Sequence, residues 1–184
     1  MNMKKTYLSA AAILVVAGIV GGIAGMSFYT KRHFQEDIVT GPNVTEVFKL
    51  SKYNPNLEGT IGDSDVYVLK GEKEGGSLVV LGSTHANEPS GHMAGILLEE
   101  NANVDVGTIY VIPNINNSAL THNDPLDGSP QYMHFTTKNG ETRTFQYGSR
   151  ATNPIDQWPD PDIYTHKSSG RLGDPQPEPL LPRR

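Results

Sequence analysis

The stretch that most constrains the fold is residues 78–91, which read Leu-Val-Val-Leu-Gly-Ser-Thr-His-Ala-Asn-Glu-Pro-Ser-Gly. Residues 78–81 are entirely apolar and lie between glycines, which predicts a buried strand of a parallel sheet. Pro89 suits the first position of a helix, where a missing N–H costs little, and we expect that helix to end at Glu99 or Asn101. The sequence therefore predicts a strand, a turn and a helix in direct succession.

His85 and Glu88 lie in the turn, at the carboxyl end of the strand, where open α/β sheets place their ligands. An imidazole nitrogen and a carboxylate at this spacing can bind one metal ion, and a later histidine would complete a zinc site with an open water position. The alternative is structural, a surface histidine and a helix-start glutamate that favours the helix dipole. The bare His-x-x-Glu pattern favours the structural alternative because it recurs by chance in many chains.

The wider pattern Gly-x-x-His-x-Asn-Glu-Pro-x-Gly, directly after an apolar strand, is more specific. It resembles the metal-binding motif of the succinylglutamate desuccinylase/aspartoacylase family, which is related to the zinc carboxypeptidases. The resemblance implies that His85 and Glu88 are the first two ligands of a Zn²⁺ ion. Ala86 stands where many members of the family have glycine.

The resemblance extends beyond this motif. Residues 121–125 and 147–164 are similar to a membrane-anchored subgroup of the family, so that roughly residues 66–171 are covered. It implies an α/β fold, the mixed sheet with flanking helices of the zinc carboxypeptidases, incomplete at the C-terminus. It also implies a zinc-dependent hydrolase of amide bonds that acts on a small N-acyl amino acid, as a deacylase, or on a peptide, as a carboxypeptidase-like enzyme.

Residues 7–29 are almost wholly apolar and uncharged, and about 20 such residues span a bilayer. A cleaved signal peptide is the alternative, but the stretch is long and lacks a clean Ala-x-Ala site. We expect a single-pass transmembrane anchor at residues 1–29 and a polar linker at residues 30–43. Lys4 and Lys5 favour a cytoplasmic N-terminus and an extracytoplasmic soluble part, although basic residues also follow the apolar stretch, which leaves the orientation open.

The composition limits the kinds of binding and catalytic site that the chain can form. The chain has 184 residues, enough for one modest domain, and its net charge of −5 argues against nucleic-acid binding. It has no cysteine, which excludes disulfides, thiolate zinc sites and a cysteine nucleophile and leaves histidines and carboxylates as candidate metal ligands. The oligomeric state does not follow from the sequence.

The remaining pattern predicts a βαβ unit with additional strands. Residues 44–50 and 65–70 are expected to form strands, and residues 107–112 a second apolar strand parallel to the first. An Asn-Gly pair within residues 131–147 predicts a two-stranded hairpin. If later strands of the sheet are missing, residues 107–112 are expected to expose an edge or an apolar face. The apolar residues that we expect the helix to bury are Met93, Ile96, Leu97 and Leu98.

Two later loops contain candidate substrate ligands. Residues 113–118 leave the second strand at the same end of the sheet as the metal motif, so Asn116 and Asn117 could contact a substrate, although asparagines are also ordinary turn formers. Arg150 could clamp a substrate carboxylate with two hydrogen bonds. The alternative for Arg150 is a surface position paired with Asp156 or Asp160.

The motif set is incomplete. In the family, a third histidine ligand and a catalytic glutamate come after a segment of the form Arg-Asn-Leu-Asn-Arg-x-Tyr-Pro-Gly, which this sequence lacks. His166 precedes the expected place of that segment, so the third ligand is not assigned to it and the catalytic residues stay unassigned. We expect residues 44–173 to be the N-terminal part of a zinc hydrolase domain. The alternative function is a non-catalytic, membrane-anchored remnant or binding module.

Residues 174–184 form an irregular tail whose four prolines forbid a helix. One nucleotide sequence that encodes residues 175–184 is CCG CAA CCT GAA CCG CTG CTA CCC CGG CGG. Read from its second base, it encodes Arg-Asn-Leu-Asn-Arg-Cys-Tyr-Pro-Gly, the missing family segment. These codons are chosen to fit, so our hypothesis of a frameshifted tail is tested by the gene itself, read in all frames.

Overall fold

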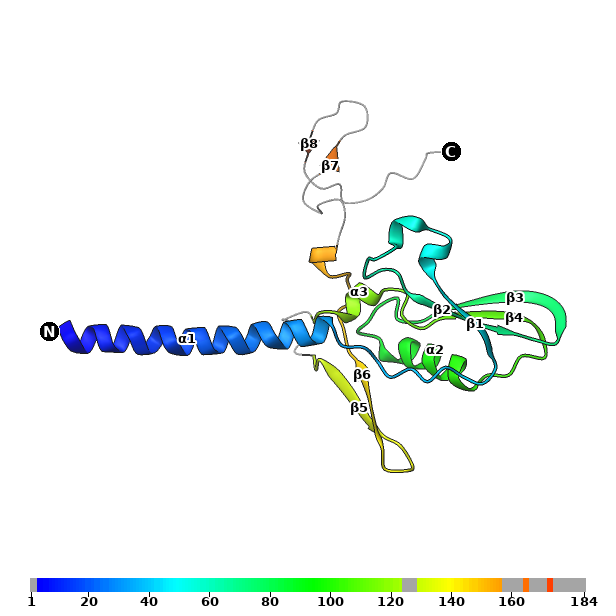
Figure 1. The fold of residues 1–184 in the computed structure, drawn as a ribbon, viewed down its shortest axis with the longest axis horizontal. Coiled ribbons are helices and arrows are strands. Elements are labelled where there is room, and N and C mark those ends of the chain that lie inside the picture. The colour runs from blue at the N-terminus through cyan, green and yellow to red at the C-terminus, as the bar shows by residue number, and fades with distance from the viewer. Residues whose placement is uncertain (1–2, 124–128, 157–163, 166–171, 174–184) are drawn as a thin grey trace.

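The computed structural model describes residues 3–123, 129–156, 164–165 and 172–173 (Figure 1). Its α-helices are α1 (Met3–Arg32), α2 (Pro89–Asn101) and α3 (Asn117–Leu120). Its strands are β1 (Val44–Lys49), β2 (Asp65–Lys70), β3 (Lys73–Leu81), β4 (Val106–Ile112), β5 (Tyr132–Thr136), β6 (Thr142–Gln146), β7 (Tyr164–Thr165) and β8 (Leu172–Gly173). Asp160, His166 and the tail at residues 174–184 lie outside the described residues.

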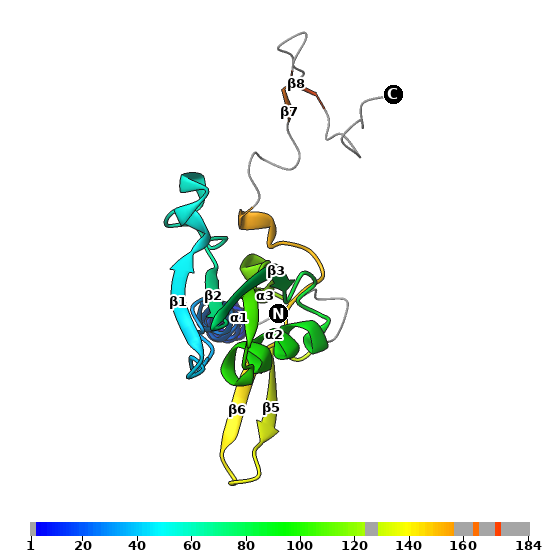
Figure 2. The same ribbon diagram turned by 90° about the vertical axis from the view of Figure 1, so that its right-hand side faces the viewer.

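The central sheet is mixed and has the strand order β1-β2-β4-β3. β3 and β4 are parallel, whereas β1 and β4 both pair antiparallel to β2. Helix α2 connects β3 to β4 and lies on one face of the sheet (Figure 2). The mixed α/β sheet and the parallel βαβ unit predicted from the sequence are therefore confirmed, as is the predicted hairpin, in which β5 pairs antiparallel to β6.

The core is centred on β2, whose four central residues are all buried. Tyr67 and Leu69 on β2 pack with Val111 on β4, and Leu98 from α2 adds a partly buried side chain to this cluster. Alternate residues of a strand face the same side of a sheet, so this cluster fills the face that α2 covers. It holds the carboxyl end of β4 and the start of β2 at one edge of the sheet.

The prediction of a buried strand at residues 78–81 is wrong. Among the described strands, β3 is an edge strand with a partner on one side only, and Leu78, Val79 and Leu81 are 55%, 57% and 53% exposed. β4, for which an exposed edge was expected, lies between β2 and β3. An apolar run indicates that a segment can form a buried strand. Whether the strand is buried depends on the strands and helices beside it, which the run does not specify.

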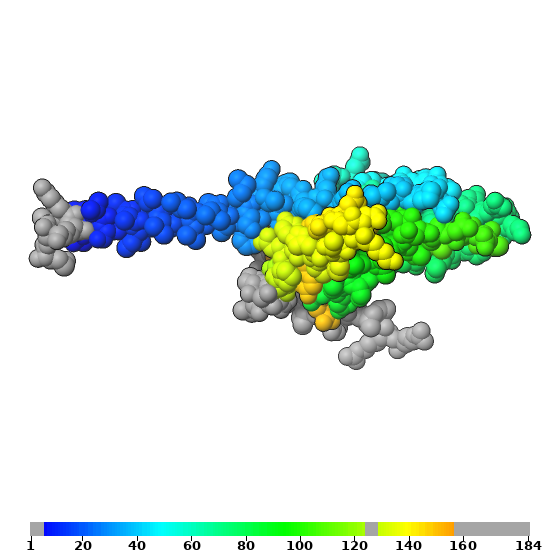
Figure 3. Space-filling model, turned by 90° about the horizontal axis from the view of Figure 1, so that it is seen from below, coloured from blue at the N-terminus to red at the C-terminus, as the bar shows by residue number. Residues whose placement is uncertain are grey.

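Helix α1 is the one helix among the described residues that is long and apolar enough to cross a membrane, over Thr6–Arg32. It extends away from the sheet, and the β5–β6 hairpin lies beside its C-terminal end (Figure 3). Lys31, in its last turn, is fully buried and donates hydrogen bonds to the carbonyl oxygens of Gln131 at 3.0 Å and Tyr147 at 2.6 Å. The end of α1 is therefore packed into the domain.

The segment predicted as a polar linker, residues 30–43, also packs against the domain. Arg32 forms a bidentate ion pair with Asp156, at 2.6 and 3.0 Å. The side chain of Glu36 is 3% exposed and accepts a hydrogen bond from the ring of His92 at 2.7 Å. Polar residues in this segment thus serve as buried contacts, a role that their composition alone does not reveal.

Candidate functional site

His85 and Glu88 are brought together by the turn between β3 and α2. The backbone N–H of Glu88 donates to the carbonyl oxygen of His85 at 3.0 Å, and α2 begins directly afterwards at Pro89, as predicted. This turn places Nδ1 of His85 in hydrogen-bond contact with Oε1 of Glu88, at 3.1 Å. The two side chains are 36% and 62% exposed, so both are open to solvent.

The donor atoms of this pair fit two positions around one metal ion. Zinc binds imidazole nitrogen and carboxylate oxygen at about 2.0–2.2 Å, so two ligands at a tetrahedral angle are separated by about 3.4 Å. The observed 3.1 Å is close to that separation. Among the described residues, no group of three or more histidine, cysteine, aspartate or glutamate side chains is arranged to hold a metal. The structure therefore brings together one imidazole and one carboxylate at this turn.

The start of the turn is held by the loop that follows β4. The N–H of Gly82 donates to the carbonyl oxygen of Ile112 at 2.8 Å, and the N–H of Ile115 donates to that of Gly82 at 3.1 Å. Ser83 has a φ of 52°, a left-handed conformation that side chains other than glycine rarely adopt. It is 2% exposed, and its hydroxyl has no hydrogen-bond partner among the described residues. Such strain is typical of positions that the surrounding structure holds in place.

Ala86 joins the turn to residues 148–149. The N–H of Ala86 donates to the carbonyl oxygen of Ser149 at 3.1 Å, and the N–H of Gly148 donates to that of Ala86 at 3.0 Å. The methyl group of Ala86 is buried against Ala119 and Leu120. Alanine at this position therefore fills a small apolar cluster.

Gly148 is the residue that leaves room for this methyl group, because a Cβ atom on it would collide with the side chain of Ala86 and the backbone of Ala119. We expect Gly148→Ala to lower the free energy of unfolding by about 1–3 kcal/mol, the usual cost of overpacking. Urea-induced unfolding of the full chain in detergent micelles measures this. Gly76→Ala is the control, because a Cβ atom at Gly76 meets nothing within 4 Å, and it should lower the free energy of unfolding less. Gly59→Ala is unsuitable because the positive φ of Gly59 would itself strain an alanine. Equal losses in the two variants would contradict the expected packing.

Arg150 directly follows the segment that pairs with Ala86, and it is exposed. Asp156, one of its two alternative partners, is instead bound by Arg32 at 2.6 and 3.0 Å. The hydrogen bonds from Arg32 hold the pKa of Asp156 below its usual value. The structure thus places the backbone of Arg150 near the turn that contains His85 and Glu88. Asp156 pairs with Arg32.

Asn116 braces the turn. Its Nδ2 donates to the carbonyl oxygen of Thr84 at 3.3 Å, and its Oδ1 accepts from the N–H of Ala119 at 3.3 Å and from the hydroxyl of Thr152 at 3.2 Å. Both ends of the amide are engaged, so Asn116 acts by positioning the loop. This role depends on contacts with distant segments, and no signal in the sequence distinguishes it from substrate binding.

Asn117, the first residue of α3, lies between two hollows of the surface. One is a groove of about 470 Å³ that Asn116 also lines, together with apolar side chains from the segment between β1 and β2. The other is a polar cavity of about 300 Å³ that Asn114 also lines. Asn117 is therefore placed to contact a small molecule in either hollow.

A comparison of the chain with protein-family models, curated protein sequences and solved structures gives no match. The assignment of the site thus depends on the motif residues and on the geometry described above.

Proposed function

We propose that His85 and Glu88 are two ligands of a zinc ion, in a domain that serves the hydrolysis of amide bonds in N-acyl amino acids or peptides. The observation that supports this proposal best is the 3.1 Å between Nδ1 of His85 and Oε1 of Glu88, which suits two ligands of one ion. Zinc, when bound, polarises a carbonyl group and lowers the pKa of water to about 7.

The surrounding residues have distinct roles in this proposal. In the hydrogen bond to Glu88 the ring nitrogen Nδ1 of His85 is the donor; to bind zinc, His85 would give up this contact and carry its proton on the other ring nitrogen. Asn116 fixes the backbone of the turn through its hydrogen bond to Thr84. The groove beside Asn116 and Asn117 is lined by Leu50, Leu57 and other apolar side chains, which suit the acyl part of a substrate. The exposed Arg150 is available to a substrate carboxylate.

We also propose that α1 anchors the domain in a membrane as a single-pass helix, with the domain on the extracytoplasmic side. The burial of Lys31 supports an uncleaved anchor, because the last turn of α1 is a packed part of the domain. In addition, Ser27 and Gln131 are joined by a hydrogen bond between their side chains. The helix and the domain are thereby connected without a free spacer.

Zinc binding by the full chain in detergent micelles tests the metal proposal. We expect His85→Ala and Glu88→Gln each to weaken zinc binding at least about tenfold, because each removes one ligand. His134→Ala is the matched control, since its ring bonds the Thr144 hydroxyl in the hairpin. Competition with a coloured chelator measures the affinities. Unchanged zinc affinity in both His85→Ala and Glu88→Gln would overturn the proposal.

The second candidate function is a non-catalytic, membrane-anchored binding module. The exposure of Glu88, whose side chain is 62% accessible, favours it, because active sites generally exclude water from the reacting groups. Hydrolysis assays with N-acetylated and N-succinylated amino acids separate the two candidates. Turnover that depends on zinc and is lost in His85→Ala supports the hydrolase. Zinc binding without turnover supports the binding module.

A further inference from the structure

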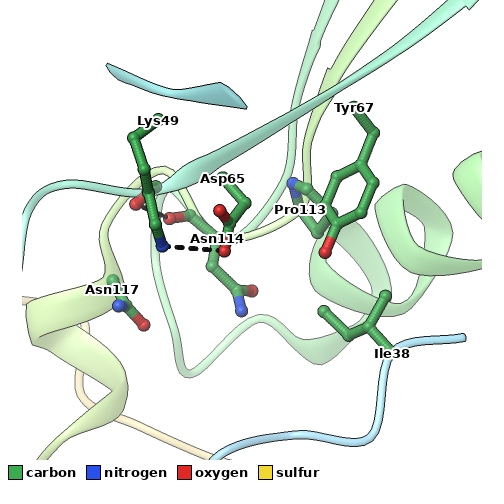
Figure 4. Close-up of a pocket in the computed structure, with 8 residues that line it drawn as sticks. Ile38, Lys49, Asp65, Tyr67, Pro113, Asn114 and Asn117 are labelled. Atoms are coloured by element: carbon green, nitrogen blue, oxygen red, sulfur yellow. Dashed lines mark hydrogen bonds and ion pairs between the residues drawn. The ribbon is translucent and has the colours of Figure 1, made fainter. Parts of the chain in front are cut away.

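A polar cavity of about 300 Å³ lies at the edge of the sheet where β4 ends and β2 begins. The segment at residues 34–38, which follows α1, forms one of its walls, and a smaller recess of about 60 Å³ adjoins it. Figure 4 shows the lining that the two share, with the polar ends of Lys49, Asp65 and Asn114 close together and Tyr67 across from them, beside Pro113. This volume is at the lower end of the range for small-molecule sites.

The wall contains an acceptor that lacks a donor. Oδ1 of Asn114 is buried and has no hydrogen-bond partner in the part of the chain that the structure describes. Its Nδ2 donates to Oε2 of Glu36 at 3.2 Å. Because an ionised carboxylate only accepts hydrogen bonds, this contact fixes the amide orientation and leaves the buried oxygen without a donor among the described residues. A buried acceptor without a donor costs free energy, so the cavity favours a ligand that brings an N–H or O–H group.

The same wall contains two opposite charges with unused bonding capacity. Lys49 and Asp65 are cross-strand neighbours joined by an ion pair of 2.9 Å. This pair uses one of the three ammonium donors of Lys49 and one of the two carboxylate oxygens of Asp65. Their side chains are 52% and 43% exposed, so both remain accessible. A ligand carboxylate can bind Lys49 while a ligand ammonium group binds Asp65.

Two neutral groups complete the wall. Burial raises the pKa of Tyr67 to about 12, so that its hydroxyl stays protonated and can donate a hydrogen bond. Asn117, on the other side of Asn114, adds an amide that can donate to a carboxylate. Glu36 is nearby but is saturated by His92, Gln146 and Asn114. The cavity thus offers separate partners for a positive and a negative group.

We propose that this cavity binds a small zwitterion, a free α-amino acid or a dipeptide, with its ammonium group on Asn114 and Asp65 and its carboxylate on Lys49 and Asn117. A neutral polyol would meet the open acceptor but gain little from the two charges. A ligand with only negative groups would be repelled by Asp65. The inference does not depend on zinc at His85 and Glu88, and its test is carried out with a chelator present.

The test is calorimetric titration of the full chain in detergent micelles with a panel of common L-amino acids and their dipeptides. We expect at least one to bind with a Kd below about 10 mM. Its N-acetyl and carboxamide derivatives, which each lack one charge, should bind at least about tenfold more weakly. Failure of the whole panel to bind, or equal binding of the two derivatives and the parent, would overturn the proposal.

A variant of Lys49 tests the assignment of the ligand carboxylate to that residue. Lys49→Met should weaken binding of the parent amino acid about tenfold but leave the carboxamide derivative unaffected, because that derivative has no carboxylate for Lys49 to bind. Lys52→Met is the matched control, since Lys52 forms a similar ion pair with Glu46 at 2.7 Å and does not line the cavity. Equal weakening by the two variants would contradict the assignment. The derivatives test the proposal on the unmodified chain even if Lys49→Met fails to fold.

Discussion

Replacing Glu36 by alanine is expected to lower the free energy of unfolding by about 3–5 kcal/mol, because several hydrogen-bond donors lose their acceptor, each at a cost of about 1–3 kcal/mol when buried. Glu36 Oε1 accepts hydrogen bonds from the ring of His92 and the backbone N–H of Gln146, both at 2.7 Å. Oε2 accepts from the amide of Asn114. One carboxylate thus connects α2, β6 and the loop after β4, and its loss leaves three donors unpaired in the interior.

Urea-induced unfolding of the full chain in detergent micelles, followed by circular dichroism, measures this loss. Glu36→Gln keeps an acceptor and should cost less than Glu36→Ala, because the uncharged amide still bonds one or two of the donors. Glu58→Ala is the matched control, since Glu58 is exposed. A loss of less than about 1 kcal/mol in Glu36→Ala would contradict the role that we assign to this carboxylate.

The role of Glu36 shows why the sequence predicted some parts of this fold and missed others. The βαβ unit, the start of α2 at Pro89 and the β5–β6 hairpin follow from apolar runs, a proline and an Asn-Gly pair, and each of these signals acts over a few residues. The burial of Lys31 and of the Glu36 side chain depends on partners more than 50 residues away. No local pattern carries that information.

The buried face of α2 makes the same point. Four apolar residues were expected inside; Ile96 is fully buried, whereas Leu97 is 49% exposed. His92 and Glu99 are buried in addition, because the segment at residues 30–43 supplies Glu36 and the backbone N–H of Gly41 as their partners. Periodicity assigns polar residues to the solvent side unless such partners are known.

At the candidate site, too, some features follow from local sequence and others depend on distant residues. The approach of His85 to Glu88 is set by a single turn, so the spacing of the motif was sufficient to anticipate it. The bracing role of Asn116, the pairing of Asp156 with Arg32 and the polar cavity all arise where distant segments meet. The motif therefore predicted that His85 and Glu88 lie close together, whereas the residues that surround them are set by tertiary contacts.

Glu99 is expected to make the domain less stable as the pH rises from about 5 to about 8. Its side chain is fully buried on α2, its Oε2 accepts a long hydrogen bond of 3.4 Å from Gly41, and its Oε1 has no partner among the described residues. Burial raises the pKa of Glu99 from 4.5 to about 7, and the charge of Glu100 adds to the shift. The hydrogen bond from Gly41 and the charge of Arg143 oppose it.

The direction of the effect follows from proton linkage. Between the unfolded and folded pKa values the native state binds more protons than the unfolded state, so the free energy of unfolding falls as the pH rises through this window. A shift from 4.5 to about 7 corresponds to at most about 3 kcal/mol, fully lost above pH 7. Glu99→Gln carries no charge at any pH, so it should remove most of this pH dependence and raise stability at pH 8 by about 2 kcal/mol.

The neighbouring glutamate provides the matched control, because Glu100 forms a bidentate ion pair with Arg143, at 2.6 and 2.8 Å. Glu100→Gln loses that pair and should lower stability at pH 8, while the fall in stability from pH 5 to pH 8 persists. Urea-induced unfolding of the full chain at these two pH values compares the three proteins. If Glu99→Gln retains the wild-type fall between pH 5 and pH 8, the buried carboxyl of Glu99 is not its source.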